Sequence, residues 1–199
     1  MKAIILLGTL KKAGLSNTET LCEFLIERLE KKQVECETVK LVDYKILPGA
    51  YSDMGRGDQW PKILKKIEAA DIVVFATPVW WGGHSSEIQR VIERLDEIHD
   101  EILDGKKSRL EGKSAGVVIT GDSDGEQHII GNFANFFSAV GLVVPPYCSL
   151  GVLSEKHEKD EKPTKTELLK AYKKDYAKTA ETMADQLIKY SLSGGQGVQ

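Results

Sequence analysis

The sequence predicts an α/β protein with a doubly wound, five-stranded parallel sheet and helices on both of its faces. Two observations support this fold class. Apolar runs of strand length alternate with amphipathic helical patterns along the chain. The runs at 72–76 and 114–120 are almost wholly apolar, which is typical of parallel strands buried on both faces. At 199 residues the chain is long enough for one sizeable core, so we expect a single domain over 1–190 and a frayed tail over 191–199.

The expected strands are short and mostly apolar, as buried strands require. They occupy residues 3–7, 34–42, 72–76, 114–120 and 142–150. Pro145 and Pro146 cannot donate hydrogen bonds to a neighbouring strand, so the fifth strand is placed at an edge of the sheet.

The expected helices follow these strands one by one. They occupy residues 17–32, 61–69, 85–98, 126–140 and 164–190. In the first, Leu21, Leu25 and Leu29 recur at helical spacing. Pro61 suits the first turn of a helix, and Gly141 suits the position just after a helix end. Charged connections are expected at 100–112 and 154–163.

The stretch 8–18 has the composition of a phosphate-binding loop. It combines glycines and lysines with the hydroxyls of Thr9, Ser16 and Thr18, and it leads directly into a helix. The first N–H groups of a helix have no intrahelical partner, and the helix dipole favours an anion there. The loop therefore predicts a phosphorylated ligand.

The same stretch is also consistent with an ordinary helix start. Ser16 and Glu19 have the spacing of a capping box, whose purpose is to begin a helix. The spacing of Gly8 and Gly14 fits neither the Walker pattern nor the dinucleotide-binding pattern G-x-G-x-x-G. Nucleotide hydrolases of the Walker type and Rossmann dinucleotide sites are thus disfavoured.

Two more turn-rich loops follow the third and fourth strands. In a doubly wound sheet, ligands bind at the carboxyl ends of the strands, where these loops meet the first. The loop after the third strand contains Trp80 and Trp81 next to Gly82 and Gly83. These tryptophans either pack beneath a helix or at a subunit contact, or they border a flat ligand. A phosphate loop opposite two planar rings favours a mononucleotide with a large ring system.

Three motifs taken together resemble the flavodoxin-like NAD(P)H-dependent FMN reductases, which include quinone reductases and iron–sulfur flavoproteins. They are GTLKKAGLSNT at 8–18, TPVWWGGHSSEIQRVIERLD at 77–96 and TGDSDGEQHIIGN at 120–132. The resemblance covers about residues 1–150. It implies the strand order 2-1-3-4-5, bound FMN, and NAD(P)H as co-substrate. The role of residues 154–199 is left unassigned.

The resemblance also implies which residues hold the FMN. Those expected at the phosphate are Thr9, Lys11, Ser16, Asn17 and Thr18. Those expected along one side of the isoalloxazine are Pro78, Val79, Trp80, Trp81 and Gly82. Those expected on the other side are Thr120, Gly121, Asp122 and Gly125. No catalytic acid or base is assigned, because hydride transfer to a flavin requires none.

Other candidate groups have simpler explanations. His84 and His128 are possible proton donors, but histidines in such positions are more often surface or capping residues. Asp122, Asp124 and Glu126 suggest a cation site or, more simply, a polar turn at a helix start. Iron–sulfur relatives have clustered cysteines after the second strand, whereas 43–60 contains none. We therefore expect no metal.

The function that this pattern predicts is electron transfer from NAD(P)H through FMN to a quinone, free flavin or similar small-molecule acceptor. The alternatives are a flavodoxin-type electron carrier without its own substrate and a binding module that has lost its flavin. Carriers tend to be strongly acidic, and the net charge here is only −3. A response-regulator receiver is excluded, because Gly8-Thr9 and Thr77-Pro78 stand where it requires acidic residues.

Composition sets the expected surroundings of the protein. The near-neutral charge gives no reason to expect nucleic acid or a membrane surface as partner. The N-terminal apolar run is too short for a signal peptide or a membrane span. Three widely spaced cysteines suggest no disulfide framework, which favours the cytoplasm. By analogy with the family, we expect a homodimer or homotetramer.

Overall fold

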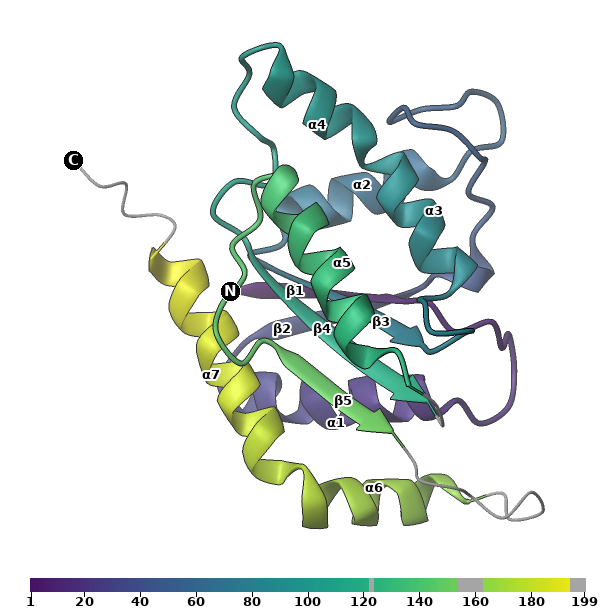
Figure 1. Ribbon diagram of the computed structural model, residues 1–199, viewed down its shortest axis with the longest axis vertical. Helices are drawn as coiled ribbons and strands as arrows, with labels where there is room; N and C mark the ends of the chain where they lie inside the picture. The colour runs from purple at the N-terminus through teal and green to yellow at the C-terminus, as the bar shows by residue number, and fades with distance from the viewer. Residues whose placement is uncertain (122–123, 154–162, 194–199) are drawn as a thin grey trace.

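The computed structural model describes residues 1–121, 124–153 and 163–193. Its strands form one parallel sheet in the order β2-β1-β3-β4-β5 (Figure 1), which confirms the expected order 2-1-3-4-5. The strands are β1 Lys2–Leu7, β2 Glu35–Lys40, β3 Ile72–Pro78, β4 Ser114–Gly121 and β5 Ser149–Leu153.

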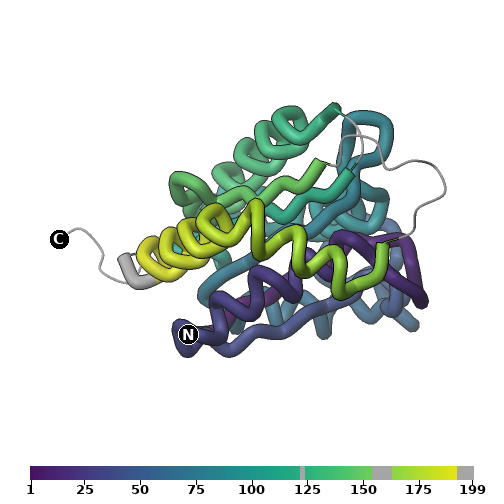
Figure 2. Tube along the Cα trace, turned by 90° about the horizontal axis from the view of Figure 1, so that it is seen from below, coloured from purple at the N-terminus to yellow at the C-terminus, as the bar shows by residue number. Residues whose placement is uncertain are grey.

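Helices cover both faces of this sheet. α1, α6 and α7 pack on one face, and α2, α3, α4 and α5 on the other. In Figure 2, the yellow α6 and α7 run beside the purple α1, while α5 lies across the sheet from them. The helices are α1 Asn17–Lys31, α2 Trp60–Ala69, α3 Ser86–Arg94, α4 Asp96–Leu103, α5 Glu126–Ala139, α6 Lys165–Asp175 and α7 Ala177–Ser193.

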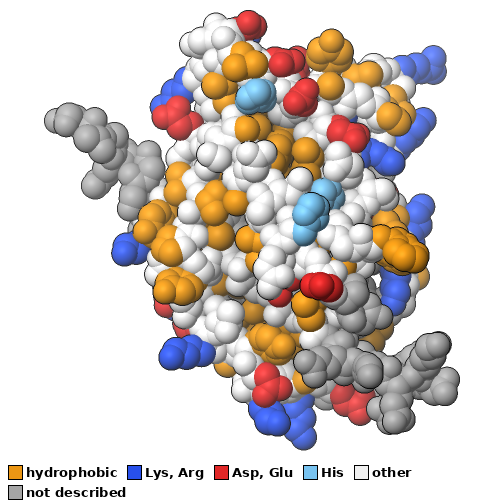
Figure 3. All heavy atoms as spheres, viewed as in Figure 1, with side chains coloured by type: hydrophobic (Ala, Val, Ile, Leu, Met, Phe, Trp, Pro, Cys, Tyr) orange, Lys and Arg blue, Asp and Glu red, His pale blue; other side chains and the backbone are white. Residues whose placement is uncertain are grey.

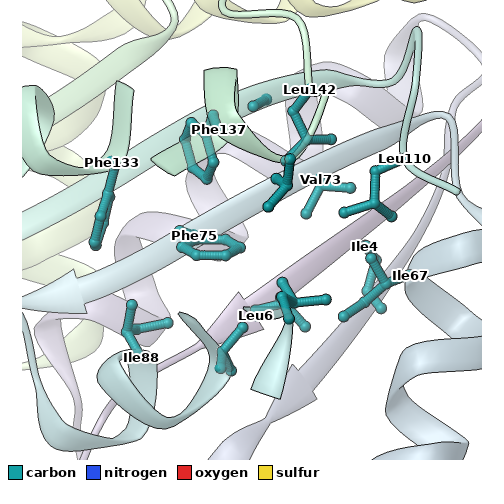
Figure 4. Close-up of a cluster of buried hydrophobic side chains, with 14 of the residues drawn as sticks. Ile4, Leu6, Ile67, Val73, Phe75, Ile88, Leu110, Phe133, Phe137 and Leu142 are labelled. Atoms are coloured by element: carbon teal, nitrogen blue, oxygen red, sulfur yellow. The ribbon is translucent and has the colours of Figure 1, made fainter. Parts of the chain in front are cut away.

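The core between the sheet and α5 is built around the aromatic ring of Phe75 (Figure 4). Its centroid lies 4.9 Å from that of Phe137 and 5.4 Å from that of Phe133, both in edge-on contact. This arrangement suits the ring quadrupoles and adds to the gain from burying the rings. Because β3 is buried on both faces, the point at which it ends is held firmly at one edge of the sheet.

The fifth strand begins later than the sequence pattern predicts. β5 starts at Ser149 rather than at 142, and only Val143 forms an isolated bridge, to Ser114, before it. Pro145 and Pro146 lie between the two pairing sites and cannot donate to a ladder, so pairing resumes after them. The edge position of this strand is confirmed.

Two expected helices are each divided into two. The helix expected over 164–190 is interrupted at Tyr176, which separates α6 from α7, and α7 continues to Ser193. Residues 194–199 of the expected tail lie outside the described residues. The helix expected over 85–98 ends at Arg94, and α4 takes up part of the connection expected over 100–112.

The surface seen in Figure 3 has apolar side chains in small separate groups, with charged side chains between and around them. No helix within 1–121, 124–153 or 163–193 is both long and apolar enough to cross a membrane.

A fully buried ion pair fastens the long loop after β2 to the end of α3. Arg94 donates from Nη2 to Asp58 at 2.7 Å, from Nε to the Tyr51 carbonyl and from Nη1 to the Leu47 carbonyl. Both charged side chains are 0% exposed. Burial opposes ionisation of Asp58, but hydrogen bonds from Arg94 and from backbone N–H groups outweigh it and lower the pKa of this carboxyl to about 2.

We predict that Arg94→Met lowers the free energy of unfolding by about 3–5 kcal/mol at pH 7, because it leaves a buried carboxylate without its partner. Lys31→Met is the control: it breaks the exposed Glu27–Lys31 pair and should cost at most about 0.5 kcal/mol. Urea unfolding monitored by circular dichroism measures the free energy of unfolding of both variants. If Arg94→Met lowers the free energy of unfolding by less than about 1 kcal/mol, the ion pair does not hold the loop on α3.

The same pair predicts an acid-sensitive stability. Folding lowers the pKa of Asp58 from its ordinary value of 3.8 to about 2. The ionised carboxylate therefore contributes its full stabilisation above pH 3.8, and this is lost as the pH falls through about 2. Asp58→Asn should remove this part of the pH dependence in urea titrations between those two values.

Candidate functional site

The loops after β1, β3 and β4 line a cavity of about 540 Å³ at the carboxyl edge of the sheet. Parallel pairing brings the loops together: Leu7 of β1 is aligned with Ala76 of β3, and Pro78 of β3 with Thr120 of β4. The volume lies within the range of about 300–1,000 Å³ that is usual for small-molecule sites. Ligands of doubly wound sheets bind at this edge.

Most of the residues predicted to hold a ligand line this one cavity. They are Thr9, Lys11, Ser16, Asn17, Thr18, Pro78, Val79, Trp80, Thr120 and Gly121. They come from β1, β3 and β4 and from the loops and helix start that follow them. The structure thus brings together residues that are up to about a hundred positions apart in the sequence.

Four buried hydroxyls connect the start of α1 to the sheet. Ser16 donates to Thr9 Oγ1 at 3.0 Å, and the hydroxyls of Thr18 and Thr120 are 2.6 Å apart. All four residues are buried although they line the cavity. Hydroxyls can rotate to donate or accept hydrogen bonds, so this cluster can also donate hydrogen bonds to an anion at the helix start.

The expected capping box is only half formed. Ser16 Oγ accepts from the backbone N–H of Glu19 at 3.3 Å, so Ser16 is the N-cap of α1. The Glu19 carboxylate instead accepts from Lys40 Nζ at 3.1 Å and does not reach back to Ser16. The first-turn N–H groups of α1 that the cap does not use are without intrahelical partners.

Among the described residues that line the cavity, Lys11 alone carries a charged side chain. Its ammonium donates to the Leu15 carbonyl at 2.8 Å and is thereby held over the loop between β1 and α1. Positive charge, hydroxyls and free helix N–H groups therefore occur on the same side of the cavity, which is the side suited to phosphate.

The loop after β3 forms a tight turn that directs its two tryptophans differently. Trp80 and Gly83 exchange two backbone hydrogen bonds of 2.8 Å, and both central residues of the turn, Trp81 and Gly82, have positive φ, +48° and +75°. This is the pattern of a type I′ turn. Trp80 is 50% exposed at the rim of the cavity, whereas Trp81 is fully exposed and does not line it.

Gly82 and Gly125 connect two loops instead of lining the cavity. A Cβ on Gly125 would lie 2.7 Å from the Cα of Gly82, so the loops after β3 and β4 can approach this closely only with glycine at 125. Val79 adds a second connection, because its N–H donates to the Thr120 carbonyl at 2.8 Å. The remaining predicted residue of this group, Asp122, lies outside the described residues.

One whole wall of the cavity is not predicted by the sequence patterns. It is formed by the end of β5, by α6 and by the residue that caps α6: Val152, Leu153, Leu168, Ala171, Tyr172 and Tyr176. Leu10, in the loop after β1, lines the cavity and was not predicted either. A signal was present in Thr164 and Glu167, which form a complete capping box at the start of α6. A helix that follows a parallel strand begins at the carboxyl edge of the sheet, beside the ligand site.

The two histidines considered as proton donors do not line this cavity. His84 Nε2 is 2.7 Å from Gln89 Oε1, and its ring centroid lies 5.0 Å from that of Phe133. His128 is exposed on α5. Within the described part of the chain, no three His, Cys, Asp or Glu side chains are grouped closely enough to hold a metal ion.

The residues present fit FMN in their chemistry. Hydroxyls, a lysine and helix N–H groups suit a doubly charged phosphate, while Pro78, Val79 and Trp80 provide an apolar border for a flat ring. The sequence model of the NADPH-dependent FMN reductase family matches residues 1–155.

The chain belongs to the NADPH-dependent FMN reductase family. The resemblance seen in the three motifs is thereby confirmed. The protein is 32% identical over 156 residues to 8-demethyl-8-aminoriboflavin-5′-phosphate synthase of Streptomyces davaonensis, covering 73% of this chain and 61% of the relative. It is 30% identical over 160 residues to a divalent metal cation transporter of Mycobacterium bovis, covering 78% of this chain and 23% of the relative.

The chain spans less than two thirds of the length of either of these relatives. Among solved structures, RosB with bound 8-demethyl-8-formylriboflavin-5′-phosphate superposes with a TM-score of 0.76 at 24% identity, covering 97% of this chain and 79% of that chain. At this identity the likeness shows the fold alone. Solved flavodoxins share the fold too, which confirms the flavodoxin-like class.

For this member of the FMN reductase family, we predict that replacing Ser16 and Thr18 together by Ala weakens FMN binding by about 3 kcal/mol. Each hydroxyl that donates to a charged group contributes about 1.5–3 kcal/mol. Fluorescence titration of the protein with FMN and with riboflavin, which has no phosphate, measures the effect.

Riboflavin binding should change little in the same double variant. Thr20→Ala is the matched control, because it removes a buried hydroxyl of α1 that bonds the Ser16 carbonyl and does not line the cavity. Equal losses for FMN and riboflavin would contradict the placement of the phosphate at this loop.

Proposed function

We propose that the protein is an FMN-dependent oxidoreductase that transfers electrons from NADH or NADPH to a small-molecule acceptor such as a quinone or free flavin. The observation that supports it most is the cavity at the carboxyl edge of the sheet, with phosphate-binding chemistry on one side and Trp80 at its rim. Family membership supports the same function. Bound FMN would supply the redox chemistry, a two-electron exchange between nicotinamide and acceptor.

The protein's own part in this function is binding and orientation. The hydroxyl cluster and Lys11 hold the phosphate, and the turn at Trp81 and Gly82 fixes Trp80 at the rim. The connections between the loops after β3 and β4 keep this rim rigid. Rigid positioning matters because it removes the entropy cost of aligning two reactants.

Stabilisation by backbone N–H groups of negative charge that develops on a reduced ring is not assigned to the loop after β3. The N–H groups of Val79, Trp80 and Gly83 are already engaged with backbone carbonyls. Trp81 and Gly82 do not line the cavity.

The acceptor, the homodimer or homotetramer and the cytoplasmic location stay predictions. The open rim beside Trp80 supports a freely diffusing acceptor over a docked protein.

We predict that NADH or NADPH bleaches the absorbance of bound FMN under anaerobic conditions without a long-lived radical. A quinone or free flavin should then restore the absorbance. Stopped-flow and equilibrium spectra measure the reduction by the nicotinamide and the reoxidation by the acceptor. Free FMN mixed with the same nicotinamide is the control for reduction without protein.

The flavodoxin-type carrier is the alternative that this titration separates from the reductase. A carrier would not be reduced by either nicotinamide and would give a stable flavin radical on photoreduction. That combination of results would contradict the proposed function.

A further inference from the structure

The wall formed by β5 and α6 lies mainly outside the part of the chain that the family shares. The family match ends at 155, whereas α6 spans Lys165–Asp175. We define the α6 wall as the residues that this side contributes to the cavity: Val152, Leu153, Leu168, Ala171, Tyr172 and Tyr176. Four of these six residues therefore lie beyond the three motifs and beyond the matched range.

The α6 wall is held in place by contacts at several points. Thr164 Oγ1 accepts from the Glu167 N–H at 3.3 Å, and Glu167 Oε2 accepts from the Thr164 N–H at 2.7 Å. Lys165 forms an ion pair of 2.6 Å with Glu23 of α1. Farther along, the ring centroid of Tyr172 lies 5.8 Å from that of Phe24. The helix therefore presents a fixed surface to the cavity.

The chemistry of this wall differs from that of the phosphate side. Its six residues carry no formal charge, whereas the phosphate side includes the ammonium of Lys11. Burial, aided by the nearby Tyr176 and Cys22, raises the pKa of Tyr172 to about 12, so its hydroxyl is neutral at pH 7. Among the described residues, this wall offers a carboxylate or sulfonate no cationic partner, only the hydroxyls of Tyr172 and Tyr176. An anion placed there would lose water without a compensating charge.

We propose that the α6 wall determines acceptor specificity by binding uncharged planar aromatic molecules and disfavouring anionic ones. Aliphatic side chains and tyrosine rings provide the surface that a flat apolar ring prefers. This inference rests on the proposed function in one respect only: it identifies the molecule bound at the wall as the electron acceptor.

Ala171 gives a direct test, because it lines the cavity yet is exposed on the helix surface. Ala171→Phe should fill the space beside the wall without disturbing the core. We expect it to weaken binding of 2-methyl-1,4-naphthoquinone to the FMN-loaded protein at least about tenfold in calorimetric titrations, a loss of about 1.4 kcal/mol. The dissociation constant of FMN should stay within about twofold of the wild-type value.

Lys173→Phe is the matched control, because it adds the same ring to an exposed position of α6 that does not line the cavity. Lys173→Phe should change neither the affinity for 2-methyl-1,4-naphthoquinone nor that for FMN. Ala171→Lys tests the role of charge: it should raise the affinity for 1,4-naphthoquinone-2-sulfonate relative to the methyl compound at least about fivefold, as a cation beside the wall would pair with the sulfonate.

Two outcomes would overturn the proposal. If Ala171→Phe weakens FMN and the naphthoquinone equally, the wall belongs to the flavin; if it weakens neither, the wall only packs α6 against the fold. Binding is measured without turnover, so the proposal can fail or succeed whether or not NADH and NADPH reduce the flavin. Failure of that reduction would contradict the proposed function alone.

Discussion

Parallel pairing of the five strands makes every strand end at the same edge of the sheet, and the site depends on this constraint. The ends of β1, β3 and β4 are aligned residue by residue, so the loops that follow them start at one level. Burial of β3 on both faces, with Phe75 enclosed by the rings of α5, keeps that edge in place. A cavity of about 540 Å³ is the result.

At this edge, short-range contacts convert loops into a defined binding surface. The paired hydroxyls of Thr18 and Thr120 connect the start of α1 with β4, and the close contact of Gly82 with Gly125 joins two loops. The cavity is consequently polar and positive on the side of Lys11 and apolar along α6. A ligand with a phosphate at one end and a flat ring at the other matches this division of chemistry.

Much of the fold and of the cavity lining that follows β1, β3 and β4 could be predicted from sequence, because both depend on local patterns. Strand alternation determines the order of elements, and hydroxyls at a helix start indicate an anion site. Trp81 was harder to place, since the sign of φ in the turn decides where its ring points. Pro145 and Pro146 fall within the expected fifth strand, whereas β5 begins after them at Ser149.

The parts that could not be predicted depend on contacts distant in sequence. The α6 wall exists because the helix after β5 packs beside α1. In the sequence, only the capping box of Thr164 and Glu167 indicates where this helix begins. The buried pair of Asp58 and Arg94 joins a loop to a helix end with no sequence pattern to announce it. Such contacts appear only once the layers have been assembled.

The ultraviolet–visible spectrum of the purified protein tests the central claim, FMN binding at this edge, most directly. The account predicts flavin absorption bands that stay with the protein through gel filtration, and release of FMN when the protein is denatured. If the protein is colourless and added FMN elutes separately from it, the account is contradicted.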